Sequence, residues 1–287
     1  MKTILYATDY SKNSAAALKY AHSLSTQLGM RLVITHVFDY PTVLGLEGLD
    51  EPFPRTEQNA IKKHRAKLEE FCEEHLGSKW NSTSIQIEPV ENESVLHGII
   101  SKADDWHAAM IITGMKGESN LRELLMGSTT KKLIEKAPCP ILAIPYDMRH
   151  TAIKTIVYAT DFEDEDIHAI QKLVEIAKPL EAEIKVVHIS TKKEYKGDLQ
   201  MEWFREMLRT KVEYSKIECK LLFSEKIFES LRRYLGDVNA DLMVMLEREK
   251  QGILNKLFQQ DLVKKMESYG KVPLLSFNEH NHHTLLF

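Results

Sequence analysis

The same sequence pattern occurs twice in this chain, and this repeat limits the fold more than any other feature. The segment KTILYATDYS at residues 2–11 returns as KTIVYATDFE at 154–163, where seven of ten positions are identical at an offset of 152. Near the end of each copy, in KKLIEKAPCPILAIP and KKMESYGKVPLLSF, Pro140 and Pro273 stand only 133 residues apart, so the second copy is about 19 residues shorter. We expect a first domain over residues 1–147, a second over residues 152–279 and a C-terminal tail over residues 280–287.

Each copy alternates short β-branched runs with stretches of helical spacing, which predicts an α/β fold made of doubly wound, five-stranded parallel sheets of the Rossmann-like type. Residues 12–28 have Ala17, Ala21 and Leu24 at helical spacing, and Gly29 is at the position of a C-terminal cap. Runs such as MIIT and PILAI are apolar without alternation, as expected for parallel strands that helices cover on both faces. The strands expected in the first copy are residues 2–8, 31–38, 83–88, 109–113 and 140–144.

Composition narrows the class of protein. The 287 residues include 43% hydrophobic and 28% charged residues, typical of a globular protein, and the formal net charge of −4 argues against nucleic acid as a partner. No apolar run is long enough to cross a membrane, and the N-terminus MKTILYATDYS predicts a strand rather than a signal peptide. Three cysteines without paired spacing indicate neither a disulfide framework nor a zinc site, which favours a cytoplasmic location.

In doubly wound sheets, ligands bind beyond the carboxyl ends of the strands, so residues that directly follow strands are candidates for a site. The segment GMKGESNLRELLMGST follows the fourth expected strand and places Gly114, Gly117 and Gly127 within fourteen positions. Glycines let a ligand approach the backbone, and amide groups at the start of the next helix attract anions. Ser128 and Thr129 begin that helix and can bond phosphate oxygens. The alternative is a pair of turns followed by Ser128 as a helix N-cap.

Neither a Walker loop nor the dinucleotide fingerprint is present, because no GK[ST] follows and GxGxxG is absent. Leu121, Leu124 and Leu125 lie at helical spacing between the two expected turns.

The pattern G-x2-G-x9-G-[ST] resembles the nucleotide-binding signature of the universal stress protein family. YATDYS and THVFD resemble the first two strands of that family, which implies that Asp9 contacts adenine or ribose and that the backbone of Val37 packs against adenine. The resemblance implies that the first copy binds ATP, with Mg²⁺ or Mn²⁺, in a fold like that of the adenine nucleotide alpha hydrolases. It also implies pairing of the last strands, here PILAIP and PLLSF, in a pseudo-twofold unit. The adenosine and phosphate residues so implied are Asp9, Val37, Gly114, Gly117, Gly127, Ser128 and, as a weaker addition, Thr129.

The second copy departs from this signature. Aligned through the shared KK and Pro, it has Glu247 in place of Gly114, Lys250 in place of Gly117, and Gln260 and Asp261 in place of Gly127 and Ser128. Two carboxylates would repel phosphates, so we expect no ATP binding in the family manner there. A different, less anionic ligand remains open. Asp161 and His188 persist, and each has a structural explanation, as a cap of a helix over 164–178 and as a buried ring.

No set of residues predicts catalysis: no paired carboxylates, no nucleophile beside a base, and no P-loop lysine. We therefore expect a nucleotide-binding regulatory protein rather than an enzyme. A slow ATPase or an adenylating enzyme of the related hydrolase-like group is an alternative, although such enzymes carry an SGGxDS-type loop where ATDYSKNS has no glycine. A stress-response adaptor without a ligand is the third hypothesis. A homodimer and an unidentified protein partner stay open.

Two further features have an ordinary and a functional interpretation. His36, His188 and the tail histidines His280, His282 and His283 invite a metal site, but lone histidines at strand ends are more often structural, and we expect no metal site. The segment 38–56 is rich in proline and glycine and leaves the second strand at the ligand edge. We expect it to cover the nucleotide or to dock on the other half, with an ordinary surface loop as the alternative.

Overall fold

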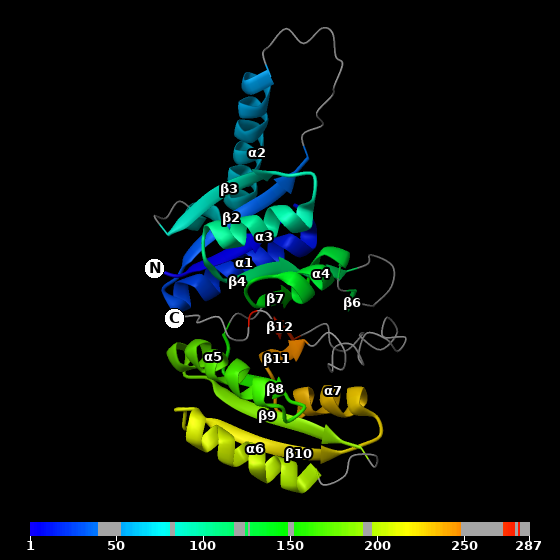
Figure 1. Ribbon diagram of the computed structural model, residues 1–287. Coiled ribbons are helices and arrows are strands. Elements are labelled where there is room, and N and C mark those ends of the chain that lie inside the picture. Colours follow the sequence, from blue (N-terminus) through cyan, green and yellow to red (C-terminus); the bar gives the residue numbers. More distant parts are fainter. Residues whose placement is uncertain are drawn as a thin grey trace.

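The computed structural model describes residues 1–39, 53–80, 84–117, 124–125, 127–148, 152–191, 197–247, 272–278 and 281. Ten strands form one continuous sheet in the order β10-β9-β8-β11-β12-β7-β4-β1-β2-β3. In this sheet the strands of each half are parallel to one another, and the central pair, β12 with β7, is antiparallel. The predicted tandem arrangement of two doubly wound five-stranded sheets, paired through their last strands, is confirmed (Figure 1).

The first half contains a complete set of alternating strands and helices. Its strands in the large sheet are β1 (Thr3–Ala7), β2 (Arg31–Phe38), β3 (Ile85–Glu91), β4 (Ala108–Gly114) and β7 (Ile141–Ile144). Its helices are α1 (Lys12–Leu28), α2 (Phe53–Leu76), the 3-10 turn η1 (Gly77–Trp80), α3 (Val95–Asp105) and α4 (Ser128–Lys136). Two short strands, β5 (Lys116–Gly117) and β6 (Leu124–Leu125), pair outside the main sheet.

The second half repeats this order. Its strands are β8 (Thr155–Ala159), β9 (Glu183–Ser190), β10 (Ile217–Phe223), β11 (Leu242–Glu247) and β12 (Leu274–Asn278). Its described helices are α5 (Asp164–Leu180), α6 (Gly197–Lys211) and α7 (Ile227–Asp237). The α6 helix has 15 residues against 24 for α2, so much of the length that the second copy lacks comes from this element.

Local sequence signals account for the element that borders the site. Ser11 is the N-cap of α1 and accepts a hydrogen bond from the Ser14 N–H, while Gly29 takes the left-handed conformation with φ 63° and closes the C-terminus, as predicted. Ala17, Ala21 and Leu24, which lie at helical spacing in the sequence, are buried. The third strand extends beyond its predicted end at residue 88, because it pairs with β2 as far as Glu91.

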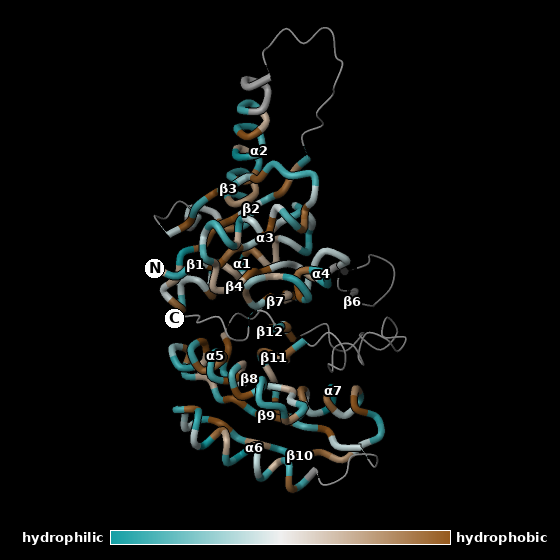
Figure 2. The backbone as a smooth tube through the Cα atoms, viewed as in Figure 1, coloured by the Kyte–Doolittle hydropathy of each residue, from teal (hydrophilic) through white to brown (hydrophobic). Residues whose placement is uncertain are grey.

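Two hydrophobic cores cover the two faces of the sheet, and each contains residues of both halves. The larger core lies under α1, α2, α5 and α6, and the other lies under α3, α4 and α7. Figure 2 shows apolar residues along the central strands, as expected for parallel strands covered on both faces. Among the described helices, none is long and apolar enough to cross a membrane.

Candidate functional site

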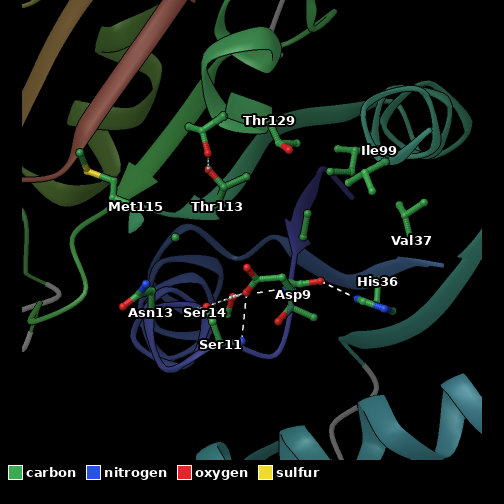
Figure 3. Close-up of a pocket in the computed structure, with 15 residues that line it drawn as sticks. Asp9, Ser11, Asn13, Ser14, His36, Val37, Ile99, Thr113, Met115 and Thr129 are labelled. Atoms are coloured by element: carbon green, nitrogen blue, oxygen red, sulfur yellow. Dashed lines mark hydrogen bonds between the residues drawn. The ribbon is translucent and has the colours of Figure 1, made fainter. Parts of the chain in front are cut away.

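A pocket lies at the carboxyl ends of β1, β2 and β4, where the order of the strands reverses. Its volume is about 170 Å³. In Figure 3, Asp9, Ser11 and Ser14 lie on one side of the pocket, Thr113 and Thr129 lie across from them, and Val37 and Ile99 together form an apolar wall beside both. The polar lining consists of Thr8, Asp9, Ser11, Asn13, Ser14, His36, Thr113, Thr129 and Thr130, and the remaining lining consists of Ala7, Val37, Val95, Ile99, Gly114 and Met115.

The turn between β1 and α1 holds the carboxylate of Asp9. The Ser11 N–H donates to Asp9 Oδ1 at 3.0 Å, and the Ser14 hydroxyl donates to the same oxygen at 2.5 Å. Burial raises the pKa of Asp9, but the hydrogen bonds from Ser11 and Ser14 lower it by more, so the net pKa lies below its usual value. In the described part of the chain no hydrogen bond reaches Asp9 Oδ2. A charged carboxylate therefore presents one oxygen to a ligand.

The end of β2 supplies a neutral histidine and an apolar contact. His36 Nδ1 lies 2.8 Å from the Thr8 carbonyl oxygen, which can only accept, so Nδ1 carries the proton. Burial lowers the pKa of His36, which favours the neutral ring. The Val37 side chain packs against α3 at Gly98, where an added Cβ would lie 2.7 Å from Val37 Cγ1. Gly98 therefore lets α3 approach closely enough to bring Ile99 to the same wall.

The end of β4 joins the opposite side of the pocket to α4. Thr113 Oγ1 and Thr130 Oγ1 are 3.4 Å apart and hydrogen-bonded. A Cβ on Gly114 would lie 2.9 Å from the backbone oxygen of Asn13 in α1. Packing of β4 against α1 therefore explains Gly114 without any ligand.

The start of α4 corrects one alternative from the sequence. Gly127, not Ser128, is the N-cap, and Ser128 is the first helical residue. No described side chain caps this end of the helix. The amide groups of the first turn are therefore available to an anion, beside Thr129 and Thr130 in the pocket wall.

The structure brings four of the seven predicted site residues to the pocket: Asp9, Val37, Gly114 and Thr129. Gly127 and Ser128 directly precede Thr129 in the chain but are absent from the described lining. Gly117 lies in β5, opposite Leu124 of β6.

The helical structure expected around Leu124 and Leu125 is wrong, because these residues form a short antiparallel pair with Lys116 and Gly117. Residues 118–123 and 126, and residues 40–52 of the expected covering segment 38–56, lie outside the described part.

The comparisons with known proteins agree with this geometry. The model of the universal stress protein family matches residues 1–145, which is half of the chain. The chain belongs to the universal stress protein family. Universal stress protein MJ0577 of Methanocaldococcus jannaschii is 28% identical over 153 residues, which cover 50% of this chain and 94% of the relative. Universal stress protein YxiE of Bacillus subtilis is 29% identical over 147 residues, which cover 49% of this chain and 97% of the relative.

A universal stress protein from Archaeoglobus fulgidus has a similar solved structure over nearly the whole length. The TM-score is 0.69 at 17% sequence identity, and the match covers 96% of this chain and 98% of that chain. This similarity shows the fold alone. It is consistent with the tandem form of the family, since this chain is about twice the length of the single-domain relatives.

The second half of this stress protein keeps the scaffold of the site but changes its charge. His188 Nδ1 donates to the Thr160 carbonyl at 2.7 Å, just as His36 does to Thr8. At the position of Ser14, the second half has Asp166, which is 1% exposed. The Asp166 carboxylate accepts hydrogen bonds from the Tyr158 hydroxyl, the Thr160 hydroxyl and the N–H groups of Asp161 and Glu163.

A second position of the site also becomes acidic in the second half. Glu247, at the position of Gly114, is 8% exposed. Glu163 is the N-cap of α5, so the expected cap at Asp161 is wrong by two residues. Lys250, Gln260 and Asp261, and the tail histidines His280, His282 and His283, lie outside the described residues. Asp166 and Glu247 replace Ser14 and Gly114 with acidic residues, which makes the second half a poor site for a polyphosphate.

Sequence reasoning missed several residues of the pocket. Ser14 had a signal, because the spacing D-x-S-x-x-S places it one helical turn after Ser11. Ile99 and Val95 had none, since α3 brings them to the pocket by tertiary packing alone.

Proposed function

We propose that the first half binds an adenine nucleotide, ATP, and that the protein is a nucleotide-dependent regulator rather than an enzyme. One observation carries this proposal: an apolar wall at Val37 and Ile99, the carboxylate of Asp9 and the uncapped start of α4 surround one pocket. A nucleotide has the matching order of chemistry, with a flat base, a ribose bearing hydroxyls, and anionic phosphates.

The proposal gives each group a place. Val37 and Ile99 contact the base, and the free oxygen of Asp9 accepts hydrogen bonds from the ribose or the base. The first-turn amides of α4, with the Ser128 and Thr129 hydroxyls, bind the phosphates. Gly117 and Gly127 would let the phosphates approach the backbone on the same side.

Mg²⁺ or Mn²⁺ would accompany the nucleotide. In the described residues, no cluster of three His, Cys, Asp or Glu side chains could hold a metal ion. The donors that the pocket offers beside α4 are hydroxyls, which are weak ligands on their own. The phosphate oxygens would therefore supply most of the coordination, and the cation would neutralise their charge.

The pocket favours binding over chemistry. The Ser14 hydroxyl donates to Asp9 and is buried, and the His36 ring bonds the Thr8 carbonyl rather than either serine. No hydroxyl of the described lining is hydrogen-bonded to an imidazole base, which a serine nucleophile would need. Any hydrolysis of ATP would be slow. The proposal includes a cytoplasmic location and leaves a homodimer and a protein partner to experiment.

Isothermal titration of the full chain with ATP and Mg²⁺ tests the proposal. We expect one site per chain, weakened at least about tenfold by Asp9→Ala and by Gly117→Glu. Asp161→Ala, the equivalent change in the second half, is the matched control and should leave the affinity unchanged. Absence of binding in the wild type would reject the proposal in favour of a ligand-free adaptor. Turnover at rates typical of enzymes would favour the hydrolase-like alternative.

A further inference from the structure

The last strand of the second half ends against the helix that borders the pocket of the first half. β12 runs antiparallel to β7 with Ser276 opposite Ile141, so the residues beyond Ser276 reach the connection between α4 and β7. Asn278 and Asn281 lie at this point and are 2% and 0% exposed. Figure 1 shows β12 between α4 and the helices of the second half.

These two asparagines, named here the asparagine clasp, bind the C-terminal end of α4. Asn278 Nδ2 donates to the carbonyl oxygens of Ile134 at 2.9 Å and Ala137 at 3.0 Å. Asn281 Nδ2 donates to the Ala137 oxygen at 3.3 Å. The backbone N–H of each asparagine also donates to the Oδ1 of the other at 2.9 Å, which fixes both side-chain amides in orientation.

The α4 helix needs such support. It has nine residues, and a helix of this length is unstable without tertiary contacts. The last carbonyl groups of a helix have no partner within it. The Ala137 N–H satisfies the Leu133 oxygen, whereas the Ile134 oxygen is satisfied by the clasp. The second half therefore completes a helix of the first half.

The opposite end of the same helix forms the pocket wall. Thr129 and Thr130 line the pocket, and Thr130 is bonded to Thr113 of β4. From Thr130 to Ala137 the helix rises about 10 Å, so the clasp is too far away to touch a bound nucleotide. A short helix moves as a unit, and release of its C-terminal end would loosen the first turn as well.

The clasp is anchored in the second half and has no equivalent side chain in the first. The Asn281 carbonyl oxygen accepts a hydrogen bond from the buried Lys172 of α5. Pro145 is at the position equivalent to Asn278 by the offset of 133, and proline has no side-chain donor. The contact therefore runs from the half with the acidic site to the half with the candidate nucleotide pocket.

We propose that Asn278 and Asn281 are positioning residues through which the second half holds α4 in the geometry that the phosphates of the nucleotide require. The expected effect on ATP affinity rests on the function proposed above, but the expected effect on hydrogen exchange in α4 does not. On this account, the second copy is retained as a support for the pocket of the first.

Hydrogen exchange and ATP titration of Asn278→Ala and Asn281→Ala in the full chain test this inference. The control is Tyr158→Phe, which removes a buried hydroxyl donor in the second half; Tyr158 belongs to the hydrophobic core on the other face of the sheet from α4. In Asn278→Ala we expect amide exchange in α4 to rise at least about tenfold over the control, with β1 and β2 unchanged, and the Kd for ATP to rise about fivefold. Asn281→Ala removes a single weaker bond and should show the same changes to a smaller extent.

Two results would overturn the inference. If the α4 amides of Asn278→Ala exchange as fast as those of Tyr158→Phe, the asparagine clasp contributes only to global stability. If α4 loosens while ATP binds with wild-type affinity, the clasp is structural only. A wild type that does not bind ATP would reject the proposed function instead, and the exchange data would still decide whether the clasp holds α4.

Discussion

Ser14→Ala removes the hydroxyl that donates to Asp9 Oδ1 at 2.5 Å and leaves the Ser11 N–H as the donor to that oxygen. A hydrogen bond to a charged group contributes about 1.5 to 3 kcal/mol. Asp9 is exposed to solvent, which screens its carboxylate, so the lower end of this range applies. We expect the free energy of unfolding to fall by about 1.5 kcal/mol at neutral pH.

This loss depends on pH. The pKa of Asp9 is below its usual value, because the hydrogen bonds from Ser11 and Ser14 outweigh the opposing effect of burial. A carboxyl group with a lowered pKa in the folded state stabilises the protein above its unfolded pKa, about 4, and loses that contribution as the pH falls through the folded pKa. The destabilisation by Ser14→Ala should therefore be full at pH 7 and shrink below about pH 4.

Urea unfolding followed by circular dichroism is the assay, with wild type, Ser14→Ala, Asp9→Asn and the double variant at pH 7 and pH 3. The double-mutant cycle should give a coupling energy of about 1 kcal/mol at pH 7 and less at pH 3. Additive effects within about 0.3 kcal/mol, or the same coupling at both pH values, would refute the assignment of Ser14 as the residue that holds Asp9.

Three further changes probe other parts of the molecule. Gly98→Ala places a Cβ 2.7 Å from Val37 Cγ1, so it should lower the free energy of unfolding by about 1 to 3 kcal/mol and weaken ATP binding. Unchanged affinity by titration would mean that Val37 does not contact the base. Asp166→Ala removes the acceptor of two buried hydroxyl groups and two partly buried N–H groups, and it should destabilise the protein by about 3 kcal/mol in urea; a loss under about 1 kcal/mol would contradict that role. Burial lowers the pKa of Lys172 to about 8, so above that pH the unfolded state binds more protons than the folded state, and the free energy of unfolding should rise from about pH 8 to 10. Lys172→Met should abolish this rise. The same pH profile in wild type and variant would contradict the lowered pKa.

The internal repeat was enough to predict the architecture. Equivalent segments must fold alike, so two copies of an alternating strand and helix pattern predict two doubly wound sheets. The order of parallel strands then identifies where a ligand binds, because the strands end at one edge. Thr129 was found in this way, since it begins a helix at that edge, whereas the role of Asp9 was inferred because YATDYS resembles the first strand of the family.

The glycines show the limit of that reasoning. Gly114 matches a ligand-binding pattern, yet the backbone oxygen of Asn13 in α1 leaves no room for a Cβ at that position. No sequence pattern marks Gly98, although a Cβ at this position would lie 2.7 Å from Val37 Cγ1. Close approach of two backbones is a property of the packed molecule, and no local pattern reports it.

The sequence by itself determined the repeat, the α/β class, the start and end of α1, and the edge at which the pocket lies, because these depend on periodicity and on residues close together in the chain. Only the tertiary structure decided which side chains meet there. It joined Ser14 to Asp9, brought Ile99 to the apolar wall, and placed Asn278 on the end of α4, 144 residues from Ile134 in the chain. Such contacts are set by how the elements pack, and the second copy reaches the pocket of the first only because β7 and β12 pair antiparallel in one sheet.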